Sequence, residues 1–338
     1  MAKQIARSII EFTHPPAIVG QAAVAGKIEA EGPLASKFSE VFWDEHIGQP
    51  TWEKAETALQ AAAIMHAMVA ANCTTEQIDL HIGGDLMNQC TATGFALRDE
   101  NIPFAGVYAA CASFALGLAL GASLVDGGGL QHTSCCGSSH FCAAEKQFRY
   151  PLELGVQPTP TAQRTATAAG AIVLAQESSA PQPRITRAIF GNVIDMGMTD
   201  PSEMGAAMAP AAWDTLRRFL QDTNTIPTDY DLILTGDLSK IGTQLLHELA
   251  RQQAGYDLAQ MHRDCGLMLY DIIAQDVGMG GSGVGCSAAV LCAEILPRMR
   301  SGELHRVLFI GTGALLSAIS PLQGESIPAV AHGVLIEM

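Results

Sequence analysis

The chain has 338 residues, of which 48% are hydrophobic and 16% are charged, so most of its length is expected to pack into the core of one large unit or two domains. Its 34 acidic and 19 basic side chains give a net charge of −15, and the lack of a Lys/Arg run excludes a nucleic-acid-binding stripe. Nine cysteines without a CxxC or Cys/His spacing fit a reducing compartment and predict no metal site.

The N-terminal region is expected to begin the folded chain directly. The first residues, MAKQIARSIIEF, become polar too soon for a signal peptide. Residues 24–53 are polar and rich in turns, which indicates a decoration on the fold. A buried strand is then predicted at 79–86, with the sequence DLHIGGDL, and it ends in Gly-Asp.

Residues 105–125 carry no charge over a length that would span a membrane. Their Ala, Gly and Ser side chains are weakly hydrophobic, and the segment divides naturally into a strand at 104–110 and a buried helix opened by Cys111. A single transmembrane helix is the alternative. We expect no membrane anchor, so membrane association would run through partner proteins.

Two further strands complete the first half, at 129–138 and 170–174, with a proline-rich loop at 149–164 between them. Residues 195–210 contain too much Gly, Met and Pro for one regular helix, so they would form a lid or a helix–helix connection.

The second half repeats the first in the same order. DLILTGDL, CSAAVLCAEIL, ELHRVLFIGT and GVLIE match DLHIGGDL, CASFALGLALG, GLQHTSCCGS and GAIVL. Apolar strands alternating with helices predict a mainly parallel sheet covered on both faces. Two such halves, 1–180 and 181–338, predict an α/β fold with five α/β/α/β/α layers and the two Cys-led helices in the centre. The alternative is that the two halves look alike only because all α/β repeats resemble one another.

Cys111 marks the predicted site, because ligands of parallel α/β sheets bind beyond the carboxyl ends of the strands. At the first turn of a helix, a thiol is expected to have a lowered pKa and to favour the thiolate. The alternative is a small buried hydrophobic residue. Cys286 occupies the matching place and is expected to be core, whereas Cys135 and Cys136 would face core and cleft alternately.

The doubled half with a Cys opening its central helix resembles the thiolase superfamily, which includes ketoacyl-ACP synthases and is expected to share this five-layer fold. The resemblance implies a nucleophilic role for the cysteine, with His/Asn or His/His partners from the second half. This chain has Asp237 where the synthases have a His-containing turn and Ser282 where thiolases have His, followed by Gly283. It has Thr312 within Gly-Thr-Gly in place of Cys-x-Gly. A working enzyme needs a base and oxyanion donors beside the thiol, so the resemblance predicts a retained pocket without catalytic residues.

Strings such as AEKQFRYP and DMGMTDP resemble the stage V sporulation protein AD family of endospore-forming bacteria over nearly the whole chain. The resemblance implies binding of dipicolinic acid (pyridine-2,6-dicarboxylate), its uptake into the forespore during sporulation and its release in germination. It also implies a location in the forespore and spore, either soluble or peripheral at the inner spore membrane, with other stage V sporulation A membrane proteins as partners. Calcium is expected only as calcium-dipicolinate, and no other cofactor. Thiolases pair through the strand before the cysteine, so a homodimer through residues 104–109 is expected.

A dipicolinate pocket needs an apolar slot, hydrogen-bond donors and a positive group. Lys146, Arg149 and Arg164 are the candidate cations, and one of them is expected to face the acid. Asp85 and Asp237 end matching strands and are expected to orient loops by accepting backbone N–H bonds. The predicted ligand-binding residues are Cys111, Ser138, Ser139, His140, Arg149, Arg164, Asp237, Ser282, Gly283 and Thr312.

Two other functions remain open at this point. The first is an active acyltransferase or condensing enzyme with Cys111 as nucleophile and His140 as a displaced base. The second is a scaffolding subunit of a membrane transport complex, with residues 24–53 and 195–210 as its partner surfaces.

Overall fold

The computed structural model describes residues 2–148, 157–317 and 319–338. The first half builds a run of strands in the order β3-β9-β7-β5-β6. Their bounds are Ala17–Gly26 for β3, Leu80–Gly84 for β5, Phe104–Gly106 for β6, His132–Ser139 for β7 and Ala168–Ala175 for β9.

The second half builds the run β10-β15-β14-β11-β12. The bounds are Arg184–Ile189 for β10, Leu232–Thr235 for β11, His262–Asp264 for β12, Arg306–Ala314 for β14 and Ala329–Glu337 for β15. When the five strands of each run are numbered along the chain, both runs have the same spatial order: first, fifth, fourth, second, third. The pair Ala17–Arg184 joins β3 to β10, so the two runs belong to one 13-stranded sheet.

Five short strands complete the set. They are β1 (Lys3–Ala6), β2 (Ile9–Glu11) and β4 (Glu40–Phe42) at the margins of the large sheet, and the pair β8 (Arg164–Thr165) and β13 (Gly281–Ser282).

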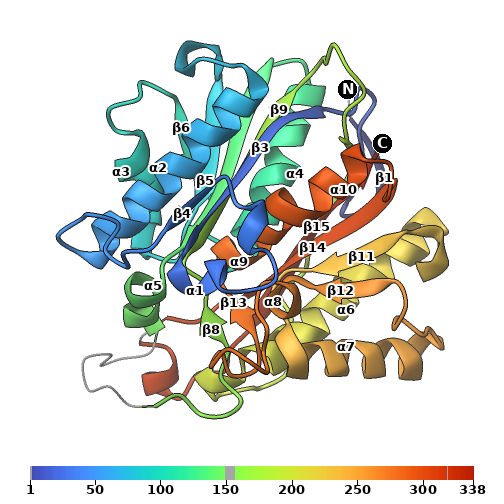
Figure 1. Ribbon diagram of the computed structural model, residues 1–338. Coiled ribbons are helices and arrows are strands. Elements are labelled where there is room, and N and C mark those ends of the chain that lie inside the picture. Colours follow the sequence, from blue (N-terminus) through green and yellow to red (C-terminus); the bar gives the residue numbers. More distant parts are fainter. Residues whose placement is uncertain (1, 149–156, 318) are drawn as a thin grey trace.

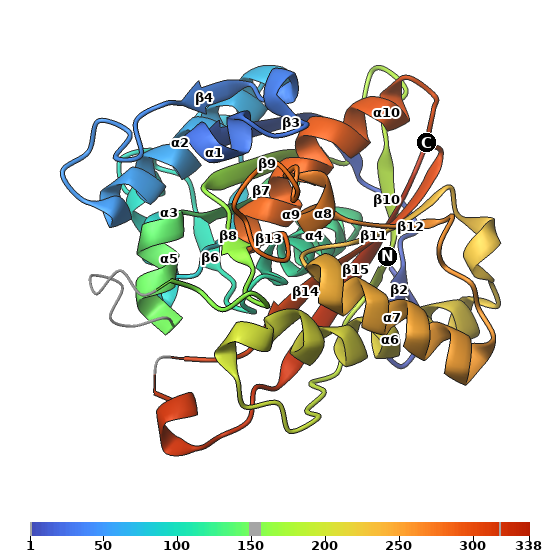
Figure 2. The ribbon, with the colours of Figure 1, turned by 60° about the horizontal axis from the view of Figure 1, so that its bottom comes forward.

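Helices form three layers around these strands (Figures 1 and 2). In the centre, α4 (Ser113–Asp126) contacts β5 and β7 on one side and β14 and β15 on the other. Its partner α9 (Val284–Val290) packs on β7 and β9 and continues through a π-helical turn into α10 (Leu296–Arg300). Both central helices are rich in small apolar residues because strands or helices cover them on all sides.

The outer layers consist of one helix pair on each side (Figure 1). On the first half, α2 (Trp52–Ala71) covers β3 and β9, and α3 (Thr91–Leu97) packs on α2. On the second half, α6 (Met204–Thr223) covers β14 and β15, and α7 (Ser239–Ala254) packs on α6. The predicted α/β/α/β/α layering with two similar halves is thereby confirmed. The remaining helices are α1 (Lys27–Ala30), α5 (Phe141–Phe148) and α8 (Cys265–Met268).

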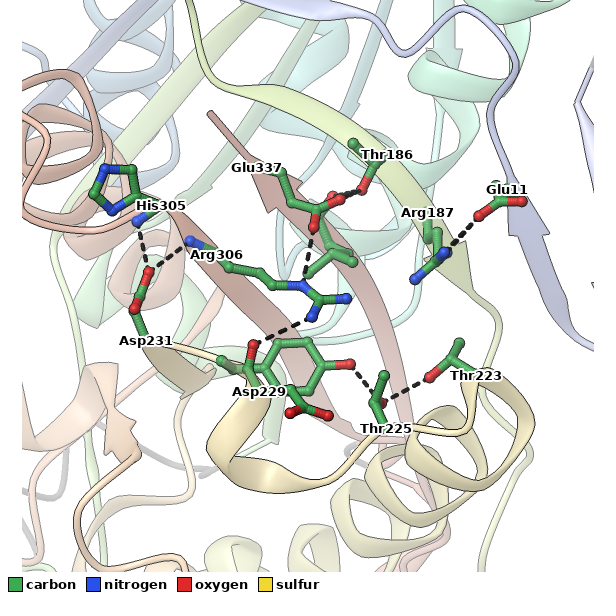
Figure 3. A network of polar contacts seen from close by, with 12 residues as sticks. Glu11, Thr186, Arg187, Thr223, Thr225, Asp229, Asp231, His305, Arg306 and Glu337 are labelled. Atoms are coloured by element: carbon green, nitrogen blue, oxygen red, sulfur yellow. Dashed lines mark hydrogen bonds and ion pairs between the residues drawn. The ribbon is translucent and has the colours of Figure 1, made fainter.

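The repeat extends to individual hydrogen bonds. Asp79 accepts the backbone N–H groups of Gln131 and His132 at 2.7 and 2.9 Å, just before β7. Asp231 accepts those of His305 and Arg306 at the same two distances, just before β14 (Figure 3). In each half an aspartate at the start of the second strand therefore fixes the start of the fourth.

Strand direction differs from the prediction of a mainly parallel sheet. β5 and β11 run parallel to their neighbours, but β9 and β15 run antiparallel to the strands on both sides. A parallel connection requires a crossover to the opposite end of the sheet. The chain instead reaches β9 and β15 from the end where β7 and β14 finish, so each closing strand is reversed.

The apolar segment 105–125 divides into β6 and α4, as predicted. No helix in the described parts of the chain combines the length and apolar character needed to cross a membrane. The strand is shorter than predicted, because β6 ends at Gly106 and the chain then turns toward the interior. Of residues 195–210, the first six have no regular structure, Pro201–Glu203 form a 3₁₀ turn, and α6 begins at Met204.

Candidate functional site

A cavity of about 500 Å³ opens beyond the carboxyl ends of β5, β6 and β14, where the sequence places a site. A volume of this size is typical of small-molecule pockets. Cys111 and Ser282 lie in its wall, and Leu86, Tyr108, Met204 and Leu315 supply much of the apolar lining.

The chain before Cys111 forms a tight elbow. Ala110 has a φ of +49°, a left-handed conformation that side chains other than glycine seldom adopt. Ser113 fixes the turn, because its hydroxyl accepts the Ala109 N–H at 2.9 Å and donates to the Ala110 carbonyl at 2.7 Å. Helix α4 begins only at Ser113, so Cys111 precedes the helix rather than occupying its first turn.

Asp237 connects the residues behind this elbow. One carboxylate oxygen accepts the Thr312 hydroxyl at 2.7 Å. The other accepts the Gly283 N–H at 2.9 Å and the Ser282 hydroxyl at 3.2 Å. The Cys111 thiol also lies beside this carboxylate. The structure thus brings together five of the predicted site residues, four of them around Asp237.

Glycine is required at position 283. Its φ of +102° suits glycine, and a Cβ there would lie 2.7 Å from the Ser139 Oγ. Ser139 in turn donates to the Ala166 carbonyl at 2.7 Å and accepts the Gly285 N–H at 3.2 Å. Ser139 therefore supports the turn that carries Ser282 and Gly283.

Burial, followed by the charge of Asp237, raises the pKa of the Cys111 thiol well above its ordinary value. The expectation of a thiolate favoured by the helix dipole is therefore wrong. The N–H groups of Ala112 and Ser113 bond locally to Ala109 and Ala110, so they are not directed at the sulfur. Burial also raises the pKa of Asp237, against the lowering effect of its hydrogen bonds.

Several predicted residues do not line the cavity. Ser138 donates to Glu56 at 3.0 Å, and the His140 backbone N–H donates to the same carboxylate. The His140 ring bonds to the Glu45 carbonyl at 2.8 Å, and burial lowers the pKa of His140. His140 and Arg164 line a separate cavity of only about 30 Å³.

The physical reason lies in strand geometry. Successive side chains of a strand face opposite sides, and the end of β7 is buried, so Ser138 points toward α2 and away from the cavity. Arg164 stacks on Phe141, with its guanidinium carbon 4.2 Å from the ring centroid. Arg149 lies outside the described residues.

Cys135 and Cys136 are both buried, in separate core clusters on the two sides of β7, so the prediction that one faces the cleft is wrong. Cys286 is buried, as expected. Asp85 accepts the N–H groups of Met87 and Thr93, both at 2.9 Å, which is the loop-orienting role predicted for it.

The cavity wall also contains polar residues that sequence reasoning did not propose as ligand contacts, namely Asn88, Gln147, Ser317 and Ser320. They lie on loops or on α5, where neither the repeat nor a motif marks them. Lys146, one of the three candidate cations, does lie in the wall.

The fold has counterparts among known structures. OleA of Xanthomonas campestris in complex with cerulenin superposes with a TM-score of 0.63 at 15% identity, over all of both chains. The 3-oxoacyl-[acyl-carrier-protein] synthase III of Aquifex aeolicus VF5 gives a TM-score of 0.59 at 14% identity, over 96% of this chain and 100% of that one. At these identities the likeness shows a thiolase-like fold alone.

Sequence comparison is more specific. The chain is 42% identical over 326 residues to the stage V sporulation protein AD of Bacillus subtilis (strain 168), which is 96% of this chain and 95% of that protein. The family model for stage V sporulation protein AD (SpoVAD) matches residues 6–337. The chain therefore belongs to the stage V sporulation protein AD family.

Proposed function

We propose that this protein binds dipicolinic acid in the cavity at Cys111 and carries out no turnover. In this role it acts in the uptake of dipicolinate or calcium-dipicolinate during sporulation and in its release in germination. The observation that carries the proposal is the cluster at Asp237, in which the groups beside the cysteine bond to one another. Membership of a sporulation family supports the biological setting.

The cavity suits a flat aromatic dicarboxylate. Its wall combines apolar side chains such as Leu86, Met204 and Leu315 with the polar residues Ser282 and Lys146. An apolar slot with a few polar groups is the usual design for a small aromatic ligand. The elbow at Ala110 and Cys111 forms part of the wall against which the ring would pack.

The same contacts argue against acyl transfer. A nucleophilic thiol needs a base that removes its proton, but burial, followed by the charge of the Asp237 carboxylate, raises the pKa of Cys111. An oxyanion needs free donors, but the Gly283 N–H and the Ser282 hydroxyl both donate to Asp237. His140, the alternative base, belongs to the other cavity.

Calorimetric titration of the purified protein with dipicolinate and with calcium-dipicolinate tests the proposal. We expect saturable binding by wild type and an affinity about tenfold lower for Cys111→Ala, because the substitution removes contact and shape from the wall. Cys73→Ala, remote from the cavity, is the matched control and should bind like wild type.

Absence of saturable binding by wild type would refute the ligand assignment. Acylation of the wild-type protein by an acyl-CoA, lost in Cys111→Ala, would show instead that the protein is an acyltransferase.

The proposal includes partners. We propose that the protein resides in the forespore and spore, peripheral to the inner membrane, where other stage V sporulation A membrane proteins hold it. Two surface decorations carry exposed apolar side chains suited to such contacts: Trp43, 63% exposed, and Met196, 71% exposed. Co-purification with the membrane proteins, lost in a Trp43→Ser/Met196→Ser variant that still binds dipicolinate, would separate binding from scaffolding.

A homodimer is also part of the proposal. β6 is the last strand in the order of the sheet, and Phe104 and Tyr108 beside it are 40% and 54% exposed. An unpaired strand edge with apolar neighbours favours pairing with a second copy.

A further inference from the structure

The charge of the cavity wall comes from Lys146. Among the described residues that line this cavity, Lys146 is the one with a charged side chain. It lies on α5, while Cys111 and Ser282 belong to the elbow and to β13. An anionic ligand in the cavity therefore has one ammonium group available to it in the described wall.

That ammonium group is already paired. Lys146 Nζ lies 2.9 Å from a carboxylate oxygen of Glu53, the second residue of α2. The same nitrogen lies 4.7 Å from the centroid of the Trp52 ring. The Lys146 side chain is 28% exposed and the Glu53 side chain is 39% exposed. Water therefore screens the pair, and it contributes little to stability.

Glu53 and Lys146 belong to different hollows of the surface. Glu53 lines a neighbouring groove of about 520 Å³ between α2 and α3, together with Lys54 and Arg98. The hydrogen bond and charge of Lys146 outweigh partial burial and lower the pKa of Glu53, so its carboxylate is ionised at neutral pH. When Glu53 leaves Lys146, it can therefore turn into a groove that contains two other cations.

We infer that Glu53 masks Lys146 in the free protein, and that a carboxylate entering the cavity displaces Glu53 and takes its place on the ammonium group. The Trp52 ring keeps the ammonium in position during the exchange through its cation–π contact. A ligand must outcompete a carboxylate already in place, so the pair discriminates against weak anions. This inference rests on the proposed function in taking the ligand to be an aromatic dicarboxylate.

The exchange also distinguishes the two forms of the ligand. Free dipicolinate is a dianion whose carboxylates attract Lys146 with their full charge, whereas in the calcium complex the metal binds one oxygen of each carboxylate and neutralises their charge. Lys146 therefore selects the free acid, and the calcium complex leaves the Lys146–Glu53 pair intact.

The test is a double-mutant cycle on the full-length protein, by calorimetry with free dipicolinate. Glu53→Gln is expected to tighten binding about two- to fivefold, as expected for removal of a partly exposed competing charge. Lys146→Met should weaken binding about tenfold, as expected for loss of a charge-assisted bond. The double variant should bind like Lys146→Met alone, because Glu53 acts only through Lys146.

Glu294→Gln is the matched control, since Glu294 pairs with Lys37 far from the cavity and its loss should leave binding unchanged. Glu53→Gln should change calcium-dipicolinate binding by less than its effect on the free acid. An equal gain from Glu53→Gln in the Lys146→Met background, or no gain in either background, overturns the inference.

Benzene-1,3-dicarboxylate, titrated against the same variants, separates the masking of Lys146 by Glu53 from the assignment of dipicolinate as the ligand. If it binds with the expected dependence on Glu53 and dipicolinate does not bind, the masking of Lys146 stands and the dipicolinate assignment fails. If neither acid binds to wild type or to Glu53→Gln, both fail.

Discussion

Asp237 determines the shape of the site through the donors that it accepts. It receives the Thr312 and Ser282 hydroxyls and the Gly283 N–H, all in a fully buried place. A turn fixed in this way presents Ser282 to the cavity and leaves Asp237 itself behind the wall. The carboxylate therefore acts on a ligand through the residues that it positions.

Removal of Asp237 should destabilise the protein and disorder the wall together. Asp237→Ala leaves the Gly283 N–H without its acceptor, so we expect a loss of about 2–3 kcal/mol in the free energy of unfolding and weaker ligand binding. Asp237→Asn keeps one oxygen acceptor, and the Thr312 hydroxyl can rotate to accept from the new amide, so its effects should be smaller. Urea unfolding measures the loss in the free energy of unfolding. Equal losses for Asp237→Ala and Asp237→Asn would contradict the role of Asp237 in fixing this turn.

At this scale the structure brings five of the predicted site residues together. Cys111, Asp237, Ser282, Gly283 and Thr312 lie in or near the carboxyl-terminal parts of β6, β11, β13 and β14, which meet at one edge. Other residues failed because their strand ends are covered. Ser138 and His140 bond to Glu56 of α2, a helix whose placement over β7 no local motif reveals.

Among the elements, β6 combines two functions. Its inner side bonds to β5, where the His81 N–H donates to the Pro103 carbonyl and the Val107 N–H to the Gly83 carbonyl. Its outer side ends the sheet, and four residues beyond it the chain reaches the Ala110–Cys111 elbow. A partner strand along this edge would therefore brace the cavity wall as well as pair two molecules.

A charge on this edge should abolish the proposed dimer. Phe104→Asp places like charges at the strand that two copies would share, where they repel one another, while Phe104→Leu keeps the edge apolar. Sedimentation should give a dimer for wild type and Phe104→Leu and a monomer for Phe104→Asp. A monomeric wild type would rule out pairing through β6 at the concentration used.

The sequence identified β6 but not its length. The apolar run 104–110 continues past the strand without a break signal, because Tyr108, Ala109 and Ala110 are as compatible with a strand as with the turn they form. The sequence did not predict the direction of β9 and β15 either, since an apolar strand pattern does not indicate whether a strand runs parallel or antiparallel to its neighbours. What sets their direction is the end of the sheet from which the chain arrives.

On the scale of the whole molecule, buried histidines make stability depend on pH. His81 on β5 bonds to the Ser134 hydroxyl on β7, and burial lowers the pKa of His81 to about 3. Above its ordinary value of 6.5, folded and unfolded states both hold it neutral. As the pH falls from 6.5 toward 3, the unfolded chain binds a proton that the folded state excludes, so stability decreases.

His81→Gln should remove this contribution. Relative to wild type, the variant should gain up to about 1.4 kcal/mol per pH unit as the pH falls below 6.5, on top of a constant offset. Urea unfolding between pH 4.5 and 8 measures the difference, with the exposed His305→Gln as control. Parallel curves for wild type and His81→Gln would show that His81 is not held neutral. The difference isolates His81 because the buried carboxyls, whose raised pKa values act in the opposite direction, are common to both proteins.

The two-half architecture was the most predictable feature, since four matching segments in one order leave few alternatives. The matching aspartates Asp79 and Asp231 explain why the repeat is visible: each fixes a strand start with the same pair of bonds.

The position of β15 has a consequence for synthesis on the ribosome. This strand comes from residues 329–337 but lies between β14 and β10, at the junction of the two halves. Until it emerges, β14 lacks one neighbour and α4 lacks its contacts with β15. The nascent chain thus presents an open apolar seam beside β14 until residues 329–337 leave the exit tunnel. Chaperones that bind apolar surface would have access to this seam until β15 is in place.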